Sequence, residues 1–382
     1  MQITGIICEY NPLHLGHQKQ IRFLRSRGDA VVCLMSGNFV QRGHPAVIDK
    51  LTRAKAAVAC GADLVLELPA QYALSSAEGF AAGGVSILSK LCDNLCFGAE
   101  DADLDGLVSI AKALLSDGFS VKLRQQLDSG LSFPAARAAA IASMGLDAKL
   151  LETPNNILAI EYCKAILAQH SGLAPLPIHR MGGYHDVMPD AENPSATAIR
   201  ELMNNGHSWQ SFVPHEAAEL LENAPMHRLE HNEKAILYRL RTMTETEFEA
   251  LPYGSEGLWR KLMHACREKN TLEEVIAATK SKRYTRTRID RMILCAYLGL
   301  TASDLAAPAP YCRVLAFNDR GREILAGVRD SGFFVNIGTD TKHPYQLLEQ
   351  RCTALYGLFG TKPEPPDVES KYRVFYQREQ TK

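Results

Sequence analysis

The stretch Gly5-Ile6-Ile7-Cys8-Glu9-Tyr10-Asn11-Pro12-Leu13-His14-Leu15-Gly16-His17 lies near the start of this 382-residue chain. An apolar run that opens at Ile3 predicts a buried first strand, because it is short, β-branched and closed by Asn-Pro. The loop ends in His-x-Gly-His, and the pattern becomes helical from Gln18. A strand, a glycine-containing loop and a helix N-terminus together form a common phosphate site, since unpaired N–H groups and the helix dipole favour negative charge.

The two histidines of this loop give it further chemistry. His14 and His17 are expected to be donors that can bear charge near neutral pH, and Gly16 lets the backbone approach a ligand. The same histidines could instead simply cap the helix that follows. Within a first strand–loop–helix unit, however, His-x-Gly-His resembles the signature of nucleotidylyltransferases and class I aminoacyl-tRNA synthetases. That resemblance implies that His14 and His17 contact ATP phosphates and stabilise the charge that builds at the α-phosphate.

Composition excludes several classes of protein. The formal net charge is −1, so a nucleic-acid partner requires a local basic patch. No apolar run is long enough to span a bilayer, and no secretory leader is apparent, so we expect no membrane association. The ten cysteines lack paired zinc-type spacing, which favours free thiols in a reducing cytoplasm. We also expect no dedicated metal site in the protein and no stable protein partner.

Strands and helices alternate through the first two hundred residues. Further strands are expected at Ala30–Leu34, Asp63–Pro69, Leu95–Gly98 and Leu176–Met181; helices are expected at Asp49–Cys60, Ser75–Leu91, Leu104–Leu115, within Val121–Ala142 and at Asn155–Leu167. This alternation predicts an α/β fold with a Rossmann-like, doubly wound parallel sheet of the nucleotidylyltransferase type. Ligands of such sheets bind beyond the carboxyl ends of the strands. We assign residues 1–205 to this ATP-binding catalytic domain.

The pattern changes after Arg200. Charged helical segments fill 201–278, and a small strand-containing tail follows, with strands expected at Tyr311–Phe317 and Phe333–Ile337 and a last short segment at Tyr372–Tyr376. Residues 206–382 are therefore predicted to form a mostly helical, α+β C-terminal region. No internal repeat is apparent.

A second phosphate-type motif lies at Ser195-Ala196-Thr197-Ala198-Ile199-Arg200. The hydroxyls of Ser195 and Thr197 can cap a helix or donate to phosphate oxygens, and the planar guanidinium of Arg200 can bind a phosphate. The segment resembles the second phosphate-binding motif of nucleotidylyltransferases. The alternative is an ordinary helix cap with a solvated arginine.

Three other segments are placed to reach the same crevice. The loop after the second strand has glycines that would let it approach a small substrate, or it is merely a connection; its candidates are Ser36, Gly37 and Asn38. Asn155 and Asn156 open a helix and suit an adenine edge, a ribose or a cap. Arg180 follows the fifth predicted strand.

As an ordered series these segments resemble one family, the bacterial tRNA(Met) cytidine acetate ligases. The matching motifs are Glu9-Tyr10-Asn11-Pro12 with His-x-Gly-His, Met35-Ser36-Gly37-Asn38-Phe39, Gly61-Ala62-Asp63 with Glu67-Leu68-Pro69, Cys96-Phe97-Gly98, Pro154-Asn155-Asn156-Ile157-Leu158 and the segment ending at Arg200. The resemblance implies an enzyme that activates acetate with ATP as acetyl-adenylate, with Mg²⁺ as the expected companion of ATP. By the same resemblance, the enzyme would then acetylate the wobble cytidine of elongator tRNA(Met) to N4-acetylcytidine.

The same resemblance implies an ATP site. Its residues would be Ile7, Cys8, Glu9, Tyr10, Asn11, Pro12, Leu13, His14, Leu15, Gly16, His17, Gln18, Lys19, Gln20, Gly98, one of Asn155 and Asn156, and Arg180. The chemistry agrees with the residues present. An acetate oxygen attacks the α-phosphorus while pyrophosphate leaves, so His14, His17 and Arg200 would supply preorganised positive potential without a protein nucleophile.

A basic segment supports an RNA partner. Lys280 to Arg291 holds six basic residues and a tyrosine in twelve positions, a composition that suits RNA backbone contacts and base stacking. The candidates are Lys282, Arg283, Arg286 and Arg288; the alternative is a solvated helix face. Two other functions remain open, a small-molecule nucleotidylyltransferase and a non-catalytic RNA-binding module on a nucleotide-binding fold.

Overall fold

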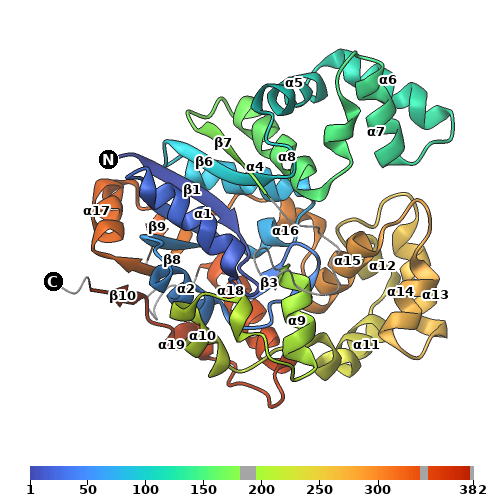
Figure 1. The fold of residues 1–382 in the computed structure, drawn as a ribbon. Helices are drawn as coiled ribbons and strands as arrows, with labels where there is room; N and C mark the ends of the chain where they lie inside the picture. Colours follow the sequence, from blue (N-terminus) through green and yellow to red (C-terminus); the bar gives the residue numbers. More distant parts are fainter. Residues whose placement is uncertain (181–194, 336–342, 379–382) are drawn as a thin grey trace.

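The computed structural model describes residues 1–180, 195–335 and 343–378. One sheet organises the molecule (Figure 1). Its strand order is β10-β8-β5-β2-β1-β6-β7, with β9 paired to β8 off this path. The strands are β1 (Ile3–Cys8), β2 (Ala30–Ser36), β5 (Leu64–Leu68), β6 (Asn94–Ala99), β7 (Ala174–His179), β8 (Cys312–Asn318), β9 (Phe334–Val335) and β10 (Phe375–Gln377). All pairs are parallel except β5 with β8, so the predicted Rossmann-like α/β fold is confirmed.

Helices cover both faces of the sheet, which is why strand β2 is buried along its whole length and apolar up to Ser36. On one face Val32 and Leu34 pack with α4 (Ala77–Leu88), α5 (Leu104–Leu114) and α8 (Pro154–Ala168). On the other, Val31, Cys33 and Met35 pack with α1 (Leu15–Ser26), α2 (Lys50–Ala59), α9 (Ala196–Asn204) and α10 (His215–Glu222). The phosphate-type loop between β1 and α1 therefore rests on a rigid two-sided core.

Two of the predicted elements differ in detail from the structure, and one short helix was not predicted. Strand β7 begins and ends two residues before the predicted Leu176–Met181, and Met181 and Ile337 lie outside the described residues. The helical segment predicted within Val121–Ala142 is two helices, α6 (Asp117–Asp128) and α7 (Phe133–Ala142). They are separated at Gly130, whose φ of +90° suits a glycine. A short helix, α3 (Ala70–Ala73), follows β5.

A third apolar core holds the helical C-terminal region. It comprises α11 (Glu233–Thr242), α12 (Glu245–Glu249), α13 (Leu258–Glu268), α14 (Leu272–Thr279) and α15 (Arg286–Leu298), with α16 (Ala302–Ala306) and α18 (Pro344–Tyr356) packed against it. Phe39 and Leu74 join this core from the N-terminal part of the chain. Figure 1 places these helices beside a small hairpin of β3 (Phe39–Val40) and β4 (His44–Pro45).

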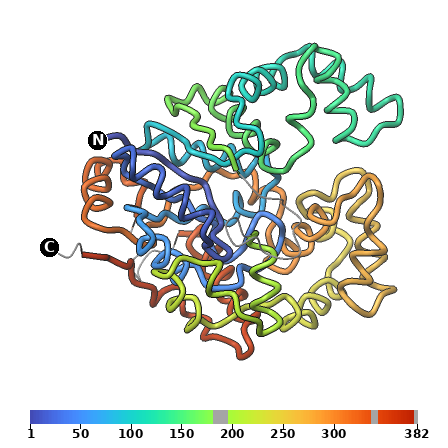
Figure 2. The backbone as a smooth tube through the Cα atoms, viewed as in Figure 1, coloured from blue at the N-terminus to red at the C-terminus, as the bar shows by residue number. Residues whose placement is uncertain are grey.

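The strand-containing tail completes the main sheet. Strand β8 pairs with β5, and β10 and β9 pair with β8, while α17 (Asp319–Gly327) and α19 (Val368–Lys371) lie between these strands in sequence. Figure 2 shows the red tail running back past the blue strands, so that both termini lie on one side. The functional division at 205/206 stays a prediction, but the sheet itself is built from both parts.

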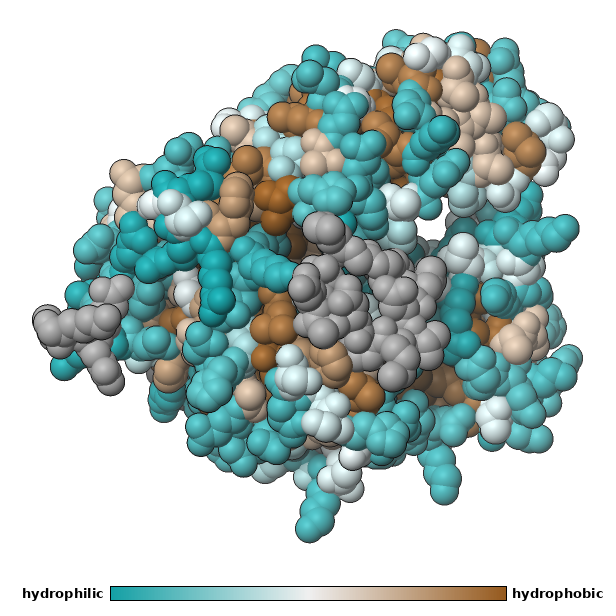
Figure 3. Space-filling model, viewed as in Figure 1, coloured by the Kyte–Doolittle hydropathy of each residue, from teal (hydrophilic) through white to brown (hydrophobic). Residues whose placement is uncertain are grey.

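The visible surface is mostly polar, with apolar atoms gathered over the lobe of α5, α6 and α7 and in a strip near the centre of the view (Figure 3). Val121 of α6 and Phe133 of α7 are among the exposed apolar side chains. Within the described residues, no helix has both the length and the apolar character required to cross a membrane.

Candidate active site at the carboxyl ends of β1 and β6

The loop that follows β1 is anchored by buried side chains. Tyr10 is buried at a φ of +45°, and its hydroxyl lies 3.3 Å from the Sγ of Cys33. The Oδ1 of Asn11 accepts from the backbone N of Val47 at 2.8 Å, and Leu13 is fully buried. These contacts fix the backbone that presents the two histidines.

Both histidines cap helix α1. The Nδ1 of His14 accepts from the backbone N of Gly16 at 3.1 Å, and the Nδ1 of His17 accepts from the backbone N of His14 at 3.3 Å. Their rings stack at 3.7 Å between centroids. The capping role considered from the sequence is therefore confirmed for the ligand-free loop, and it fixes the tautomer. An imidazole that accepts at Nδ1 carries its proton on Nε2.

The expectation that these histidines are charged near neutral pH is wrong for this arrangement. Burial, followed by the positive charges of Arg180 and Arg200, lowers the pKa of His14 to about 3. Burial, followed by the charges of His14 and Arg180, lowers the pKa of His17 well below its usual value. Both rings are therefore neutral Nε2–H donors at pH 7. The Nε2 of His14 is buried without a hydrogen-bond partner among the described residues, a state that costs about 1–3 kcal/mol and suits a site for an incoming acceptor.

The downstream motif joins this loop. Arg200 donates from Nη1 to the carbonyl oxygen of Asn11 at 2.6 Å and from Nη2 to the Oγ1 of Thr197 at 3.1 Å. Ser195 caps α9 by accepting from the backbone N of Ala198 at 3.1 Å. Ser195 and Thr197 thus have the capping and orienting roles, while the solvated-arginine alternative is wrong because Arg200 is partly buried against the loop.

A second arginine, Arg180, lies near enough to the histidines to lower the pKa of both. Arg180 donates from Nη1 to the Oδ1 of Asn155 at 3.1 Å, and it lies beside Gly98. Asn155 in turn donates from Nδ2 to the Oε1 of Glu100 at 2.6 Å. Asn156 is buried, and its Oδ1 accepts from the backbone N of Asp101 at 3.1 Å. Asn155 therefore faces the crevice, and Asn156 holds the turn after β6.

Glu100 orients Asn155 and the start of α8. The sequence analysis did not identify this residue. Its carboxylate accepts from Thr153 Oγ1 at 2.9 Å and from the backbone N of Asn156 at 2.9 Å at the start of α8. Burial alone would raise the pKa of Glu100, but these hydrogen bonds, with that from Asn155, lower it overall. Its fixed negative charge lies near Arg180 and orients that cation.

Several residues of the predicted ATP segment make contacts within the protein, and their assignment to ATP stays a prediction. Gln18 donates to the Oε2 of Glu216 at 3.1 Å, and Gln20 donates to the carbonyl oxygen of Cys96 at 3.4 Å. Ile7 packs close to Gly84 of α4. The remaining members are the buried Cys8 and Pro12, the partly exposed Leu15 and Gly16, and the exposed Lys19.

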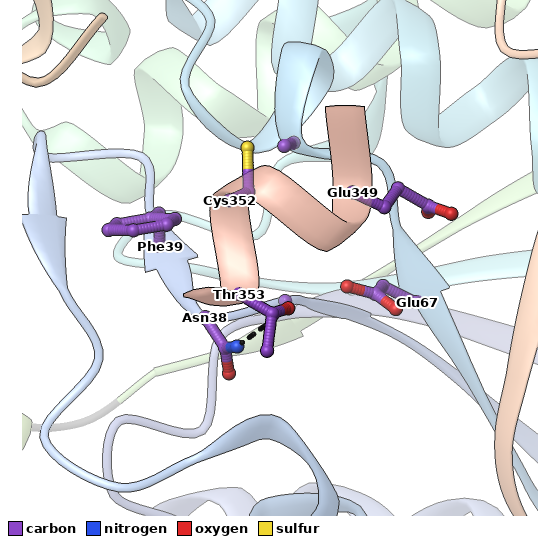
Figure 4. Close-up of a pocket in the computed structure, with 8 residues that line it drawn as sticks. Asn38, Phe39, Glu67, Glu349, Cys352 and Thr353 are labelled. Carbon is purple, nitrogen blue, oxygen red and sulfur yellow. Dashed lines mark hydrogen bonds between the residues drawn. The ribbon is translucent and has the colours of Figure 1, made fainter. Parts of the chain in front are cut away.

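The loop 36–38 faces an acidic pocket (Figure 4). Asn38 donates to the Oγ1 of Thr353 at 3.3 Å, and a Cβ at Gly37 would overlap the carboxylate of Glu67. Burial, followed by the charge of Glu67, raises the pKa of Glu349 to about 7. The cations of Lys50 and Arg313 lie against Glu67 and offset its charge, so the assignment of Gly37 and Asn38 to acetate stays a prediction. Ser36 is buried with an Oγ that lacks a hydrogen-bond partner in the described structure.

Charged groups beneath the pocket lock the tail to the sheet. Lys50 Nζ lies 2.8 Å from the Oε1 of Glu67 and 2.9 Å from the Oε1 of Glu369 in α19. Arg313 of β8 also contacts Glu369. These residues are separated widely in sequence, so no local pattern predicts the cluster.

Arg53 is a structural residue that the sequence analysis missed. Fully buried in α2, it donates to the carbonyl oxygens of Ile48 at 2.8 Å, Glu9 at 2.6 Å and Ser36 at 3.1 Å. It therefore joins the carboxyl ends of β1 and β2. A single arginine within the alanine-rich face of a predicted helix was the available signal.

The basic segment divides into two kinds of residue. Lys282 and Arg283 are exposed on the turn before α15. Arg286 forms a bidentate pair with Glu273 at 2.6 Å for each contact. Arg288 donates from Nε to the carbonyl oxygen of Tyr253 at 3.0 Å. The last two charges are thus partly used within the protein.

The described residues contain no group of three or more histidine, cysteine, aspartate or glutamate side chains arranged to hold a metal ion. All ten cysteines lie within the described ranges and are free thiols.

Comparisons with known proteins agree with this geometry. A family model described as HIGH Nucleotidyl Transferase matches residues 1–370. A tRNA(Met) cytidine acetate ligase from Clostridium novyi is 40% identical over 347 residues, covering 85% of this chain and 86% of that protein. The protein of the same name from Clostridium tetani is 36% identical over 397 residues, covering 96% of this chain and 98% of its own.

Solved structures are similar over the whole chain. The apo crystal structure of Thermotoga maritima TmcAL superposes with a TM-score of 0.90 at 29% identity, covering 99% of this chain and 100% of that one. The same protein bound with alpha-thio ATP gives a TM-score of 0.87 with the same identity and coverage.

Proposed function

The chain belongs to the tRNA(Met) cytidine acetate ligases, a family of HIGH nucleotidyl transferases, and from this premise we propose the reaction that it catalyses. The enzyme activates acetate with ATP as acetyl-adenylate and then acetylates the wobble cytidine of elongator tRNA(Met) to N4-acetylcytidine. The observation that carries this proposal is the buried Nε2 of His14, which has no hydrogen-bond partner among the described residues and lies in a loop held by Arg200 and under the positive charge of Arg180. A buried donor near two cations is suited to a phosphate oxygen.

ATP would bind across the carboxyl ends of β1 and β6. His14 and His17 would donate from Nε2 to phosphate oxygens, and the fixed cations Arg180 and Arg200 would stabilise negative charge as pyrophosphate leaves. Because these groups are oriented before ATP arrives, little reorganisation is needed. Asn155 is the asparagine that we assign to ATP, since it bonds to Arg180 while Asn156 holds the adjacent turn.

Acetate would bind near Ser36. Its buried hydroxyl, which has no hydrogen-bond partner in the described ranges, lies at the carboxyl end of β2, next to the end of β1 that leads into the histidine loop. The hydroxyl can donate to a carboxylate oxygen. Gly37 and Asn38 would support this site by holding the loop.

Elongator tRNA(Met) would contact the C-terminal region. The exposed Lys282 and Arg283 are suited to phosphate contacts, and Arg286 and Arg288 extend the same positive surface along α15. This surface follows the histidine loop by more than 260 residues in sequence. The β3–β4 hairpin contacts both the loop and α15, so one tRNA would reach both.

Mg²⁺ would enter on the phosphates of ATP, because the described residues offer no cluster built to hold it, and no step is assigned to it here. A cytoplasmic location is proposed from the tRNA substrate and from the ten free thiols.

A direct assay tests the function. The protein is incubated with ATP, acetate and total tRNA, and the tRNA is digested and analysed for N4-acetylcytidine by mass spectrometry. Acetate-dependent acetylation of the wobble position of elongator tRNA(Met) is the expected result. Transfer of a nucleotide to a small metabolite without any acetylcytidine would indicate the small-molecule alternative, and RNA binding without turnover of ATP would indicate the non-catalytic one.

A further inference from the structure

A hairpin joins the histidine loop to the basic helix. The backbone N of Gln41, between β3 and β4, donates to the Oε1 of Glu9 at 2.7 Å, and its carbonyl oxygen accepts from the Nη1 of Arg291 at 3.2 Å. Gly43, at a φ of +84°, lies so close to α15 that a Cβ would overlap the backbone N of Arg291. Residues 39–45 therefore lie between the two sites proposed above (Figure 1).

This hairpin carries a histidine paired with a carboxylate. The Nε2 of His44 lies 3.8 Å from the Oδ2 of Asp290. The His44 side chain is 38% exposed, whereas that of Asp290 is 4% exposed. Asp290 is held in turn by the Nε of Arg286 at 3.6 Å. One edge of the imidazole thus faces a buried acid while the rest remains accessible.

The surroundings of His44 are positively charged. Burial, followed by the charges of Arg200, Arg286 and Arg42, lowers the pKa of His44 to about 4. His44 is therefore neutral at pH 7, but a pKa of about 4 makes the ring a weak base until the nearby positive charge is offset. Bound tRNA phosphates would offset the three arginines, which would increase the proton affinity of the ring. Arg200 is also the residue that donates to Asn11, so His44 lies near the adenylating loop.

The second half-reaction needs a proton acceptor. The exocyclic amine of cytidine forms a bond to the acetyl carbon, the bond between that carbon and the AMP oxygen breaks, and AMP leaves with the electron pair. The nitrogen must then lose one proton to become an amide. His14 and His17 are poorly suited to take it, because each uses Nδ1 to accept from the backbone and carries hydrogen on Nε2.

We propose that His44, beside Asp290, accepts the proton that the cytidine amine loses during acetyl transfer. With Nε2 turned toward Asp290, the Nδ1 of His44 is the accepting atom. Asp290 lies beyond hydrogen-bond distance of the neutral ring, and its contribution is electrostatic, because a carboxylate at 3.8 Å stabilises the protonated imidazole. The inference rests on the proposed function, since it assigns a role in its second step.

The test separates the two half-reactions. Acetate-dependent ATP–pyrophosphate exchange reports adenylation, filter binding reports tRNA affinity, and single-turnover transfer is measured from preformed enzyme-bound acetyl-adenylate. The variants are His44→Ala and His44→Gln, with His207→Ala, an exposed histidine after α9, as the matched control. Transfer is expected to fall about a hundredfold or more in both His44 variants, a typical loss for a general base, with exchange and tRNA affinity unchanged.

Glutamine is the decisive substitution, because its amide can fill space and form hydrogen bonds but cannot take a proton. If either His44→Gln or His44→Ala transfers the acetyl group at the wild-type rate, His44 is not the proton acceptor. If the thermal transition shows that His44→Ala is unfolded, His44→Gln alone decides. A wild-type protein that forms acetyl-adenylate but never acetylates tRNA would instead overturn the proposed function.

Discussion

The Nη1 of Arg200 lies 2.6 Å from the carbonyl oxygen of Asn11, across a sequence separation of 189 residues. The downstream motif thereby closes the loop that carries both histidines. Arg200→Ala should lower the rate of acetate-dependent ATP–pyrophosphate exchange on the order of a hundredfold, because a preorganised cation is lost. Arg200→Lys should recover only part of it, since an ammonium lacks the planar fork. The control Arg322→Ala, on the exposed side of α17, should keep the wild-type rate of exchange. If Arg200→Ala exchanged pyrophosphate at that same rate, Arg200 would have no role in adenylation.

His17→Ala should nearly abolish formation of acetyl-adenylate while leaving the fold intact. Removing one such stabilising donor typically costs about a hundredfold or more in rate. The measurement is again pyrophosphate exchange, accompanied by a thermal melt. Near-normal exchange with an unchanged melting temperature would show that His17 only caps the helix.

The depressed pKa of His14 predicts a pH dependence of stability. The folded pKa of about 3 is below the usual 6.5, so the unfolded chain binds more protons between these values. The stabilising contribution of neutral His14 is thus complete above about pH 6.5 and is lost progressively as pH falls toward 3. In the His14→Gln variant, the denaturation midpoint should change less with pH over this window than it does in the wild type. Parallel pH curves for the two proteins would contradict the assignment.

The basic surface makes a prediction about tRNA binding. Neutralising Lys282, Arg283, Arg286 and Arg288 together should weaken tRNA affinity strongly and leave acetate activation largely unchanged. Within this set, Lys282→Ala with Arg283→Ala should account for most of the loss, since both side chains are exposed. Each lost phosphate contact should reduce the salt slope of binding by about 1. The measurement is tRNA affinity at several salt concentrations. If the dependence of affinity on salt stayed at the wild-type value, the segment would be a solvated helix face that does not contact tRNA.

Ser36→Ala should raise the KM for acetate while leaving the KM for ATP unchanged. The buried hydroxyl of Ser36, which has no hydrogen-bond partner among the described residues, is available to a carboxylate. Exchange assays with varied acetate and varied ATP make the distinction. An unchanged acetate KM would exclude Ser36 as a ligand.

Breaking the buried charge cluster should cost stability. Lys50→Met removes one of the two cations that contact Glu67 and Glu369, the other being Arg313, and loss of one partner of a buried pair typically costs about 3–5 kcal/mol. Chemical denaturation measures the free energy of unfolding. Lys371→Met serves as the control, because that lysine is exposed in its pair with Asp367. A loss no larger than the control's would mean that the cluster contributes little.

The strands and the histidine loop were predictable because each depends on residues that are close in sequence. The position of Arg200 beside the loop was predictable because the carboxyl ends of parallel strands meet at one edge of the sheet. The charge states of His14 and His17 were not predictable, since they depend on burial and on cations from other elements. Glu100 and the cluster around Lys50 were missed for the same reason. The partners of Glu100 lie more than 50 residues away and Glu369 lies 319 residues from Lys50, and neither Glu369 nor Glu67, which is 17 residues from Lys50, follows a periodic pattern.

The pairing of β8 with β5 has a consequence for how the chain can be made and divided. Until residues near 318 have left the ribosome, the edge of β5 presents unpaired backbone groups, and such an edge readily pairs with another chain. A fragment ending near residue 205 would retain the histidine loop and Arg200 but keep this open edge. It should therefore self-associate, so the adenylating part cannot be isolated as a well-behaved module by cutting the chain at that point.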